Sequence, residues 1–423
     1  MVNQCSWGSW KCSAAILAAL DRLQTQVTAA DCGIPAAMVT MSVEDPGDDS
    51  PLLPEAVEAG TPGRLAHRQP ITKPGSWDFF FLSRSQNLAL GAALLFGCYS
   101  AVLIPAYFPL KKAIFNDPRP KNLVLFNRSA SLLLDPCRPR WCLNRLKRLP
   151  CSEGLLDIPV FVQQDVPSSW DLPPPLGLRG SEEHLALALA SLPQLGLPPS
   201  LRGEGGCRRC VVVGNGGVLH GSHLGAHIDQ YDVIIRMNNA PVSGFERDAG
   251  SRTTVRLLYP EGAPHSGNEY RETTTVALVV FKSLDLDWLI SVVTRRPLGF
   301  WSKLWFWREV VEDIPLTRES FRILHPEIIR RTGRVLQRYT LTRGKMVPTL
   351  GASAVVMALQ VCDQVSLAGF GYDMQHPQSQ LHYYEAVPMD AMKAQVVHDI
   401  GAEKLFLRDL VAAGATTDLT GAL

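Results

Sequence analysis

Two asparagines stand where short apolar runs end. Val211-Val212-Val213 leads into the glycine loop Gly214-Asn215-Gly216-Gly217, and Val233-Ile234-Ile235 leads into Arg236-Met237-Asn238. Ligands of open α/β sheets bind at the carboxyl ends of the strands, where glycines let backbone N–H groups approach a phosphate. Amide side chains placed there could hydrogen-bond a phosphate or a ribose without adding charge. Both asparagines could equally cap turns, and their spacing leaves the two roles open.

The glycine loop disfavours two common classes of nucleotide-binding protein. The third glycine of GxGxxG would fall at Leu219, and Arg236-Met237-Asn238 stands where an acidic residue would bind a ribose. The GK[ST] sequence of a P-loop is absent as well. Nicotinamide enzymes and P-loop NTPases are therefore weak interpretations.

Two histidines in the last third of the chain could perform acid–base chemistry. His382 opens the sequence His-Tyr-Tyr-Glu385 after the loop 369–373, and His398 precedes Glu403 by five residues. A histidine can act as a general base near neutral pH, and a protonated histidine can stabilise a leaving phosphate. Lone histidines are more often structural, so their positions alone assign neither role.

Two further patterns resemble metal sites. Asp285-Leu286-Asp287 has the spacing with which many sugar transferases hold a metal and a diphosphate. Trp288-Leu289-Ile290 continues at once as a predicted helix, which favours Asp287 as a cap or first-turn acid. Cys207-Arg-Arg-Cys210 lacks the second pair of ligands that a zinc site needs. We therefore expect no metal.

The elements that position these residues alternate between strands and helices, which predicts an α/β fold with a mostly parallel central sheet covered on both faces. Apolar runs predict strands at 211–213, 233–235, 276–281 and 365–368. Helical patterns are expected near 222–228, 287–294, 305–312, 352–360 and 389–413.

The 423-residue chain divides into four predicted parts. Residues 1–86 lack sustained periodicity and are expected to be a disordered tail. Residues 87–108 carry no charge and are long enough for a single transmembrane helix. Residues 109–206 are rich in proline and are expected to be a stem with a helix at 182–192, and residues 207–423 form the catalytic domain. The net charge of +1 gives no general electrostatic case for nucleic-acid binding.

The orientation of the predicted membrane segment is not settled by local charge. Basic residues follow the segment closely, and the positive-inside rule alone would place the C-terminal side in the cytoplasm. The sequon Asn127-Arg128-Ser129 and the later cysteines make sense in an oxidising lumen. Those cysteines allow several disulfide connectivities; they are Cys137, Cys142, Cys151, Cys207, Cys210 and Cys362.

Four segments resemble the motifs of animal sialyltransferases. Residues 207–264 are similar to the large motif, 347–373 to the small motif, 382–385 to the third motif and 398–403 to the very small motif. They occur in the family's order and spacing. Residues 300–315, 321–324 and 137–140 are most similar to the ganglioside-forming branch that sialylates lactosylceramide. Asp248 departs from that branch, whose mammalian members tend to carry histidine there, and agrees with the broader family.

The resemblance implies a metal-independent variant of the GT-A fold and a particular site. Asn215, Asn238, Thr349, Gly351 and Gly371 would line the pocket for CMP, and Val218 replaces a second donor-contacting asparagine of some relatives. His382 would approach the donor phosphate, and His398 would be the general base. Cys210 would pair with Cys362, and Cys207 with Cys137. Family members of this branch are single-pass type II Golgi proteins with a lumenal catalytic domain.

The resemblance predicts an inverting transfer of sialic acid from CMP-sialic acid to the 3-OH of a terminal galactose, with lactosylceramide as the first acceptor and glycoprotein glycans as the alternative. A metal-dependent transferase using Asp285 and Asp287, or a glycan-binding protein without activity, are weaker alternatives. The sequence leaves homo-oligomer formation open. The aromatic stretch 300–311 could be a core helix, which we favour, or could guide a lipid acceptor at the membrane surface.

Overall fold

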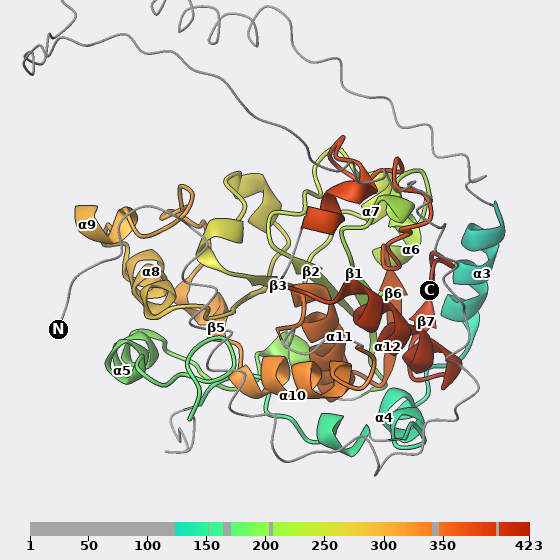
Figure 1. Cartoon of the computed structure of the whole chain (residues 1–423), viewed down its shortest axis with the longest axis horizontal. Coiled ribbons are helices and arrows are strands. Elements are labelled where there is room, and N and C mark those ends of the chain that lie inside the picture. The colour runs from blue at the N-terminus through green and yellow to red at the C-terminus, as the bar shows by residue number, and fades with distance from the viewer. Residues whose placement is uncertain (1–122, 151, 164–170, 203–205, 341–346, 395–396) are drawn as a thin grey trace, which may run out of the picture. The chain divides into compact units, whose positions relative to one another are not determined.

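The computed structural model describes residues 123–423 except 151, 164–170, 203–205, 341–346 and 395–396 (Figure 1). The expected tail at 1–86 and membrane segment at 87–108 lie outside the described residues. In the part of the chain that is described, no helix is both long and apolar enough to cross a bilayer.

One seven-stranded sheet forms the centre of the fold. Its order is β5-β4-β3-β2-β1-β6-β7, and every neighbouring pair is parallel. The predicted α/β class with a parallel sheet is confirmed. The strands are β1 (Arg209–Val213), β2 (Val233–Met237), β3 (Val255–Leu258), β4 (Thr275–Leu278), β5 (Phe321–Ile323), β6 (Gln364–Ala368) and β7 (Thr417–Asp418).

Helices connect these strands and cover the sheet. They are α3 (Leu123–Leu134), α4 (Trp141–Leu146), α5 (Glu182–Ser191), α6 (Gly225–Ile228), α7 (Glu246–Ala249), α8 (Ser283–Thr294), α9 (Phe300–Lys303), α10 (Pro326–Leu336), α11 (Leu350–Val361) and α12 (Ile400–Ala412). A 3-10 helix, η10 (Met389–Ala394), precedes α12.

Alternating side chains of each strand enter different cores, as the two-residue period of a strand requires. In β1, Cys210 and Val212 pack into the core beneath α10, α11 and α12, whereas Val211 and Val213 pack with residues of α6 and α7. Beside β4 and β5, helices α5 and α8 cover a third cluster around Trp288. Both faces of the sheet are therefore buried, which explains the continuous apolar runs of its strands.

Three predicted helices have different bounds in the structure. Helix α8 begins at Ser283, four residues before the expected start. The pattern at 389–413 divides into η10 and α12. The helix predicted at 305–312 is wrong, because residues 309–314 have no regular structure and the short helix α9 ends at Lys303.

The described part of 109–206, which we expected to be a stem, contributes to the same core. Cys142 and Leu146 of α4 and Leu155 are fully buried against residues of the sheet and α11. The disulfide Cys137–Cys207 joins this region to the segment before β1, and Cys210–Cys362 joins β1 to the end of α11. Both are pairs that the family resemblance implies. Cys142 is a buried free thiol, Cys151 lies outside the described residues, and Asn127 is exposed on α3.

Candidate active site

Two glycine loops lie against each other where β1 and β6 end. Gly214 N donates to Ala368 O at 2.7 Å, and Gly216 N donates to Gly369 O at 2.9 Å. A Cβ at Gly214 would lie 2.5 Å from Gly369 O, and Gly369 has a φ of +74°. Only glycine permits both the close approach and that backbone conformation. The two loops therefore pack backbone against backbone at the carboxyl edge of the sheet.

The segment carrying His382 crosses the β1 loop. His382 forms an antiparallel bridge with Gly216, and Tyr383 N donates to Asn215 O at 3.0 Å. The imidazole of His382 pairs through Nδ1 with Glu385 and stacks on Tyr384 with ring centroids 5.4 Å apart. Asn215 Nδ2 donates to Tyr384 Oη at 3.3 Å. The structure thus brings Asn215 and His382, two predicted site residues, into one hydrogen-bonded group.

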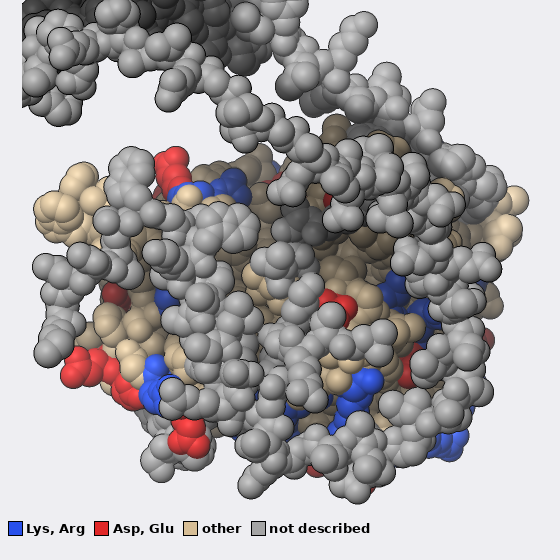
Figure 2. Space-filling model, viewed as in Figure 1, with Lys and Arg blue, Asp and Glu red and all other residues tan. Residues whose placement is uncertain are grey.

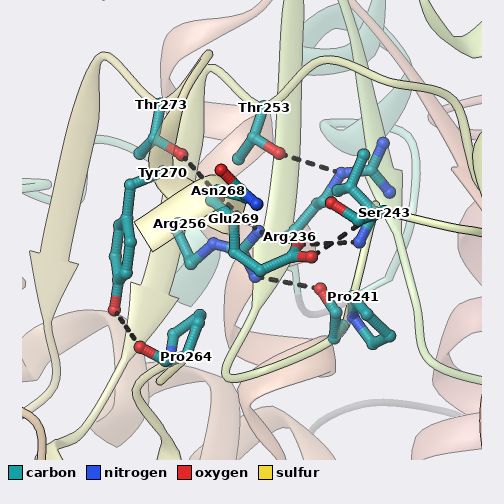
Figure 3. Close-up of polar contacts among 12 residues, drawn as sticks. Arg236, Pro241, Ser243, Thr253, Arg256, Pro264, Asn268, Glu269, Tyr270 and Thr273 are labelled. Carbon is teal, nitrogen blue, oxygen red and sulfur yellow. Dashed lines mark hydrogen bonds and ion pairs between the residues drawn. The ribbon is translucent and has the colours of Figure 1, made fainter. Parts of the chain in front are cut away.

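Asn238 is held in the left-handed region by a buried charge cluster. Its φ is +49°, and Arg256 Nη1 donates to its carbonyl oxygen at 2.7 Å. Glu269 accepts from the backbone N–H groups of Val242 and Ser243 and lies 3.7 Å from Arg256. Figure 3 shows Glu269 between Arg256 and Arg236.

Burial lowers the pKa of both arginines, that of Arg236 to about 10, so Arg236 stays charged at neutral pH. Arg236 Nη2 donates to backbone carbonyls, and its Nε lies 3.1 Å from Thr253 Oγ1 (Figure 3), whereas its buried Nη1 has no hydrogen-bond partner among the described residues. This cluster fixes the loop 238–243. In the sequence, the only sign of the cluster is an arginine within each of two apolar strands, Arg236 in β2 and Arg256 in β3.

Three buried oxygens at this edge have no protein donor among the described residues. They are Asn215 Oδ1, Asn238 Oδ1 and Glu261 Oε2, which follow β1, β2 and β3. Buried acceptors are normally satisfied, and an exception needs a partner such as a ligand or water. A ligand with hydroxyl or amino hydrogens would satisfy them. Sequence reasoning missed Glu261, whose other oxygen accepts from Lys282 Nζ at 2.8 Å.

Thr349 begins helix α11 and is held by a buried glutamate. Its Oγ1 accepts from Ala352 N at 3.2 Å, which caps the helix. Thr349 N and Oγ1 donate to Glu403 Oε1 and Oε2 at 2.7 and 2.6 Å. Burial raises the pKa of Glu403 to about 7, against the opposing effect of the Thr349 hydrogen bonds. Gly351 lies in the first turn, where a Cβ would come 3.2 Å from the Phe370 ring.

His398 has one tautomer fixed by the backbone. Its Nδ1 lies 2.8 Å from Val347 O, and a carbonyl oxygen can only accept, so Nδ1 carries a proton. In the neutral ring the lone pair is then on Nε2. His398 and Glu403 belong to the very small motif, and Glu403 lies on α12. The contacts His398–Val347 and Glu403–Thr349 therefore join this motif to the small motif.

Gly371 completes the loop after β6. Its φ is +93°, and a Cβ there would lie 2.4 Å from Ala422 O near the C-terminus. The sequence-predicted residues thus follow β1, β2 and β6 or begin α11, while His382 bridges Gly216 and His398 contacts Val347 before α11. Asn238 is one strand away from Asn215, because β2 pairs with β1.

The two aspartates of the DxD pattern have other partners. Asp285 is fully buried in the first turn of α8 and accepts from Phe281 N at 2.8 Å and Lys282 N at 3.1 Å. Asp285 is thus the first-turn acid that we had assigned to Asp287. Asp287 lies in the helix and contacts His184 Nδ1 at 2.6 Å. Across the described residues, no group of three acidic, histidine or cysteine side chains could hold a metal ion.

The glycine loops, the amides and the capped helix lie at one sheet edge, where open α/β proteins bind their ligands. The chain belongs to glycosyltransferase family 29, the sialyltransferases, which residues 161–415 match. The expected family and enzyme class are confirmed.

The chain is similar to characterised members of that family. It is 41% identical over 303 residues to the lactosylceramide alpha-2,3-sialyltransferase of Homo sapiens, covering 69% of this chain and 72% of that protein. It is 42% identical over 254 residues to the CMP-N-acetylneuraminate-beta-1,4-galactoside alpha-2,3-sialyltransferase of Mus musculus, covering 59% of this chain and 67% of that protein. A crystal structure of a mammalian sialyltransferase is 31% identical, with a TM-score of 0.47, and the match covers 57% of this chain and 80% of that one.

Proposed function

We propose that the protein transfers sialic acid from CMP-sialic acid to the 3-OH of the terminal galactose of lactosylceramide. The observation that carries the donor assignment is the pair of buried amide oxygens of Asn215 and Asn238, which have no protein donor among the described residues and lie beside the glycine loops. This edge suits a nucleotide, whose amino and hydroxyl groups donate hydrogen bonds and whose phosphate accepts them. The relatives named for lactosylceramide support the acceptor.

In the proposed reaction, His398 Nε2 removes the proton from galactose O3 as this oxygen attacks the anomeric carbon of sialic acid. The bond from that carbon to the CMP phosphate oxygen breaks, its electron pair leaves with CMP, and configuration inverts. A protonated His382, paired with Glu385, would stabilise the negative charge on the departing phosphate. The transition state has oxocarbenium character, as in other glycosyl chemistry.

A second acceptor class is favoured by a specific residue. Asp248 Oδ1 accepts from His223 N at 2.9 Å, and Asp248 also accepts from Gly221 N. This carboxylate holds the loop after β1 as an aspartate would in the broader family, whereas mammalian glycolipid enzymes tend to carry histidine there. Relatives that are named for beta-1,4-galactosides match at a similar identity. Galactose of glycoprotein glycans is therefore the alternative acceptor.

The proposal includes a cellular setting. The uncharged segment 87–108 would anchor the protein as a single-pass type II Golgi enzyme, with CMP-sialic acid and the galactoside meeting in the lumen. Exposed Asn127 would be available for glycosylation there.

The test is a panel of acceptors with labelled CMP-sialic acid, followed by linkage analysis of the product. We expect lactosylceramide to exceed lactose-terminated glycopeptides in kcat/KM, and the product linkage to be α2,3. His398→Ala should lower turnover by roughly 10²–10⁴-fold, the usual contribution of a general base. The exposed His265→Ala is the matched control and should keep the wild-type rate. Near-normal turnover of a folded His398→Ala protein would remove this residue from the mechanism.

A further inference from the structure

An aromatic patch protrudes from the region around α9. Its members, Phe300, Trp301, Leu304, Trp305 and Trp307, are each between 61% and 75% exposed. No residue of α9 is buried, so the core-helix interpretation of this stretch is wrong. Exposed apolar residues scattered singly are normal, but these five are close together in sequence. Contiguous exposed apolar patches mark interaction sites.

The backbone that carries the patch is well anchored. Phe306 is buried, and Lys282 Nζ lies 4.6 Å from the centre of its ring. Trp288 Nε1 donates to Val311 O at 2.6 Å, and Glu312 accepts from Leu298 N at 2.7 Å. The aromatic side chains are therefore presented to solvent by a fixed loop.

The charged residues around the patch include two ion pairs and Arg308, whose guanidinium carbon lies 5.8 Å from the centre of the Trp307 ring. Arg295 pairs with Asp313, and Lys303 pairs with Glu312. In Figure 2 the surface at the place of α9 is tan, without blue or red over its outer tip. The interfacial layer of a bilayer prefers tryptophan, and Trp301, Trp305 and Trp307 are all exposed in the patch.

The predicted membrane anchor lies close in sequence to the described residues. The uncharged segment ends at Phe108, and only residues 109–122 separate it from α3. These residues span at most roughly 45 Å when extended, at about 3.3 Å per residue. Figure 1 shows α3 and α9 at opposite ends of the long axis. A bilayer that holds the anchor and contacts α9 would therefore constrain the catalytic unit at two separated points.

We propose that the aromatic patch inserts into the interfacial layer of the lumenal leaflet and orients the catalytic unit on the membrane. The occupant is the lipid surface itself, and insertion does not require catalysis. One consequence rests on the proposed function: a galactose on a lipid headgroup would reach the donor site at the carboxyl edge of the sheet without leaving the bilayer.

The direct test uses the full chain in nanodiscs of phosphatidylcholine or its brominated analogue. We expect bromine to quench part of the tryptophan fluorescence, and the Trp301→Ser, Trp305→Ser double variant to lose that part. High salt should leave the quenching unchanged, because the five side chains of the patch are uncharged. Equal quenching of wild type and variant would overturn the proposal. A second outcome would also overturn the proposal: the wild type self-associates in detergent, and the double variant loses this self-association but keeps the quenching. The patch would then be a contact with a second copy of the chain.

A kinetic test compares two leucines with the same exposure. Leu304 belongs to the patch, whereas Leu187 lies on α5, and both are 61% exposed. We expect Leu304→Ser to lower kcat/KM for lactosylceramide in nanodiscs several-fold and to spare soluble lactosides, with Leu187→Ser unchanged on both. The double tryptophan variant should lose at least tenfold on the lipid acceptor. Equal losses on lipid and soluble acceptors would refute orientation by the patch. Absence of activity on any galactoside in the wild type would refute the proposed function and leave the quenching result intact.

Discussion

The buried contact between Glu403 and Thr349 predicts a pH-dependent stability that one substitution should remove. Glu403 is 6% exposed, and burial raises its pKa from 4.5 to about 7. A shift of this size corresponds to about 3 kcal/mol, since one pKa unit is about 1.4 kcal/mol. Between these two pH values the folded protein keeps a proton that the unfolded chain has lost. Stability contributed by this group is therefore present below pH 4.5 and is lost as pH rises to about 7.

Glu403→Gln mimics the protonated carboxyl and keeps its shape. The amide oxygen can accept from Thr349 N, and the amide nitrogen can donate to Thr349 Oγ1 in place of the acid proton. We expect the variant and the wild type to have similar unfolding free energies near pH 5. Near pH 8 the variant should gain about 3 kcal/mol relative to the wild type, because it has no buried charge to accommodate.

Urea unfolding with intact disulfides, at about pH 5 and about pH 8, measures this difference. The matched control is Glu153→Gln, which changes an exposed glutamate and should give a difference that does not vary with pH. A constant difference between Glu403→Gln and wild type across this range would refute the reasoning. It would mean that the carboxyl is not desolvated as its contacts indicate.

Two further predictions concern the donor site. Asn238→Ala should raise the KM for CMP-sialic acid by roughly tenfold, which corresponds to the loss of about one hydrogen bond. The control variant Asn144→Ala changes an exposed asparagine and should leave this KM unchanged. Steady-state kinetics with varied donor measure both, and equal KM values for Asn238→Ala and wild type would contradict the assignment. Activity should survive EDTA and the Asp287→Asn substitution, because Asp285 caps α8 and Asp287 contacts His184; inactivation that Mn²⁺ reverses would contradict this expectation.

The strands that the sequence predicted are those with uninterrupted apolar runs. β1 and β6 have such runs and were found at nearly their true bounds. β3 and β5 escaped prediction because each has a buried arginine, Arg256 and Arg322, in the middle of an apolar stretch. The free energy cost of burying these two arginines is offset by hydrogen bonds to backbone carbonyls, and for Arg256 also by Glu269. Those partners are distant in sequence, so no local pattern reveals them.

A family motif can name a candidate site residue, but the sequence does not reveal the tertiary contacts that hold it. His398 and Thr349 were expected from motifs, but the proton on His398 Nδ1 is fixed by Val347 O, and Thr349 is held by Glu403. The aromatic stretch was misjudged because periodicity cannot distinguish a buried helix from an exposed loop of similar composition.

Tyr383 shows why the parts of the donor site should act as a unit. Its backbone N–H donates to Asn215 O, and its hydroxyl donates to Pro241 O at 2.6 Å. It therefore joins the loop after β1 to the loop after β2, and it neighbours His382 in sequence. The loop after β2 is in turn fixed by the Arg256–Glu269 cluster, so a change at any of these positions shifts both amides. Energetic effects of neighbours that share such contacts are not additive. The loss of donor-binding free energy in the Asn215→Ala, Asn238→Ala double variant should therefore be smaller than the sum of the losses in the two single variants.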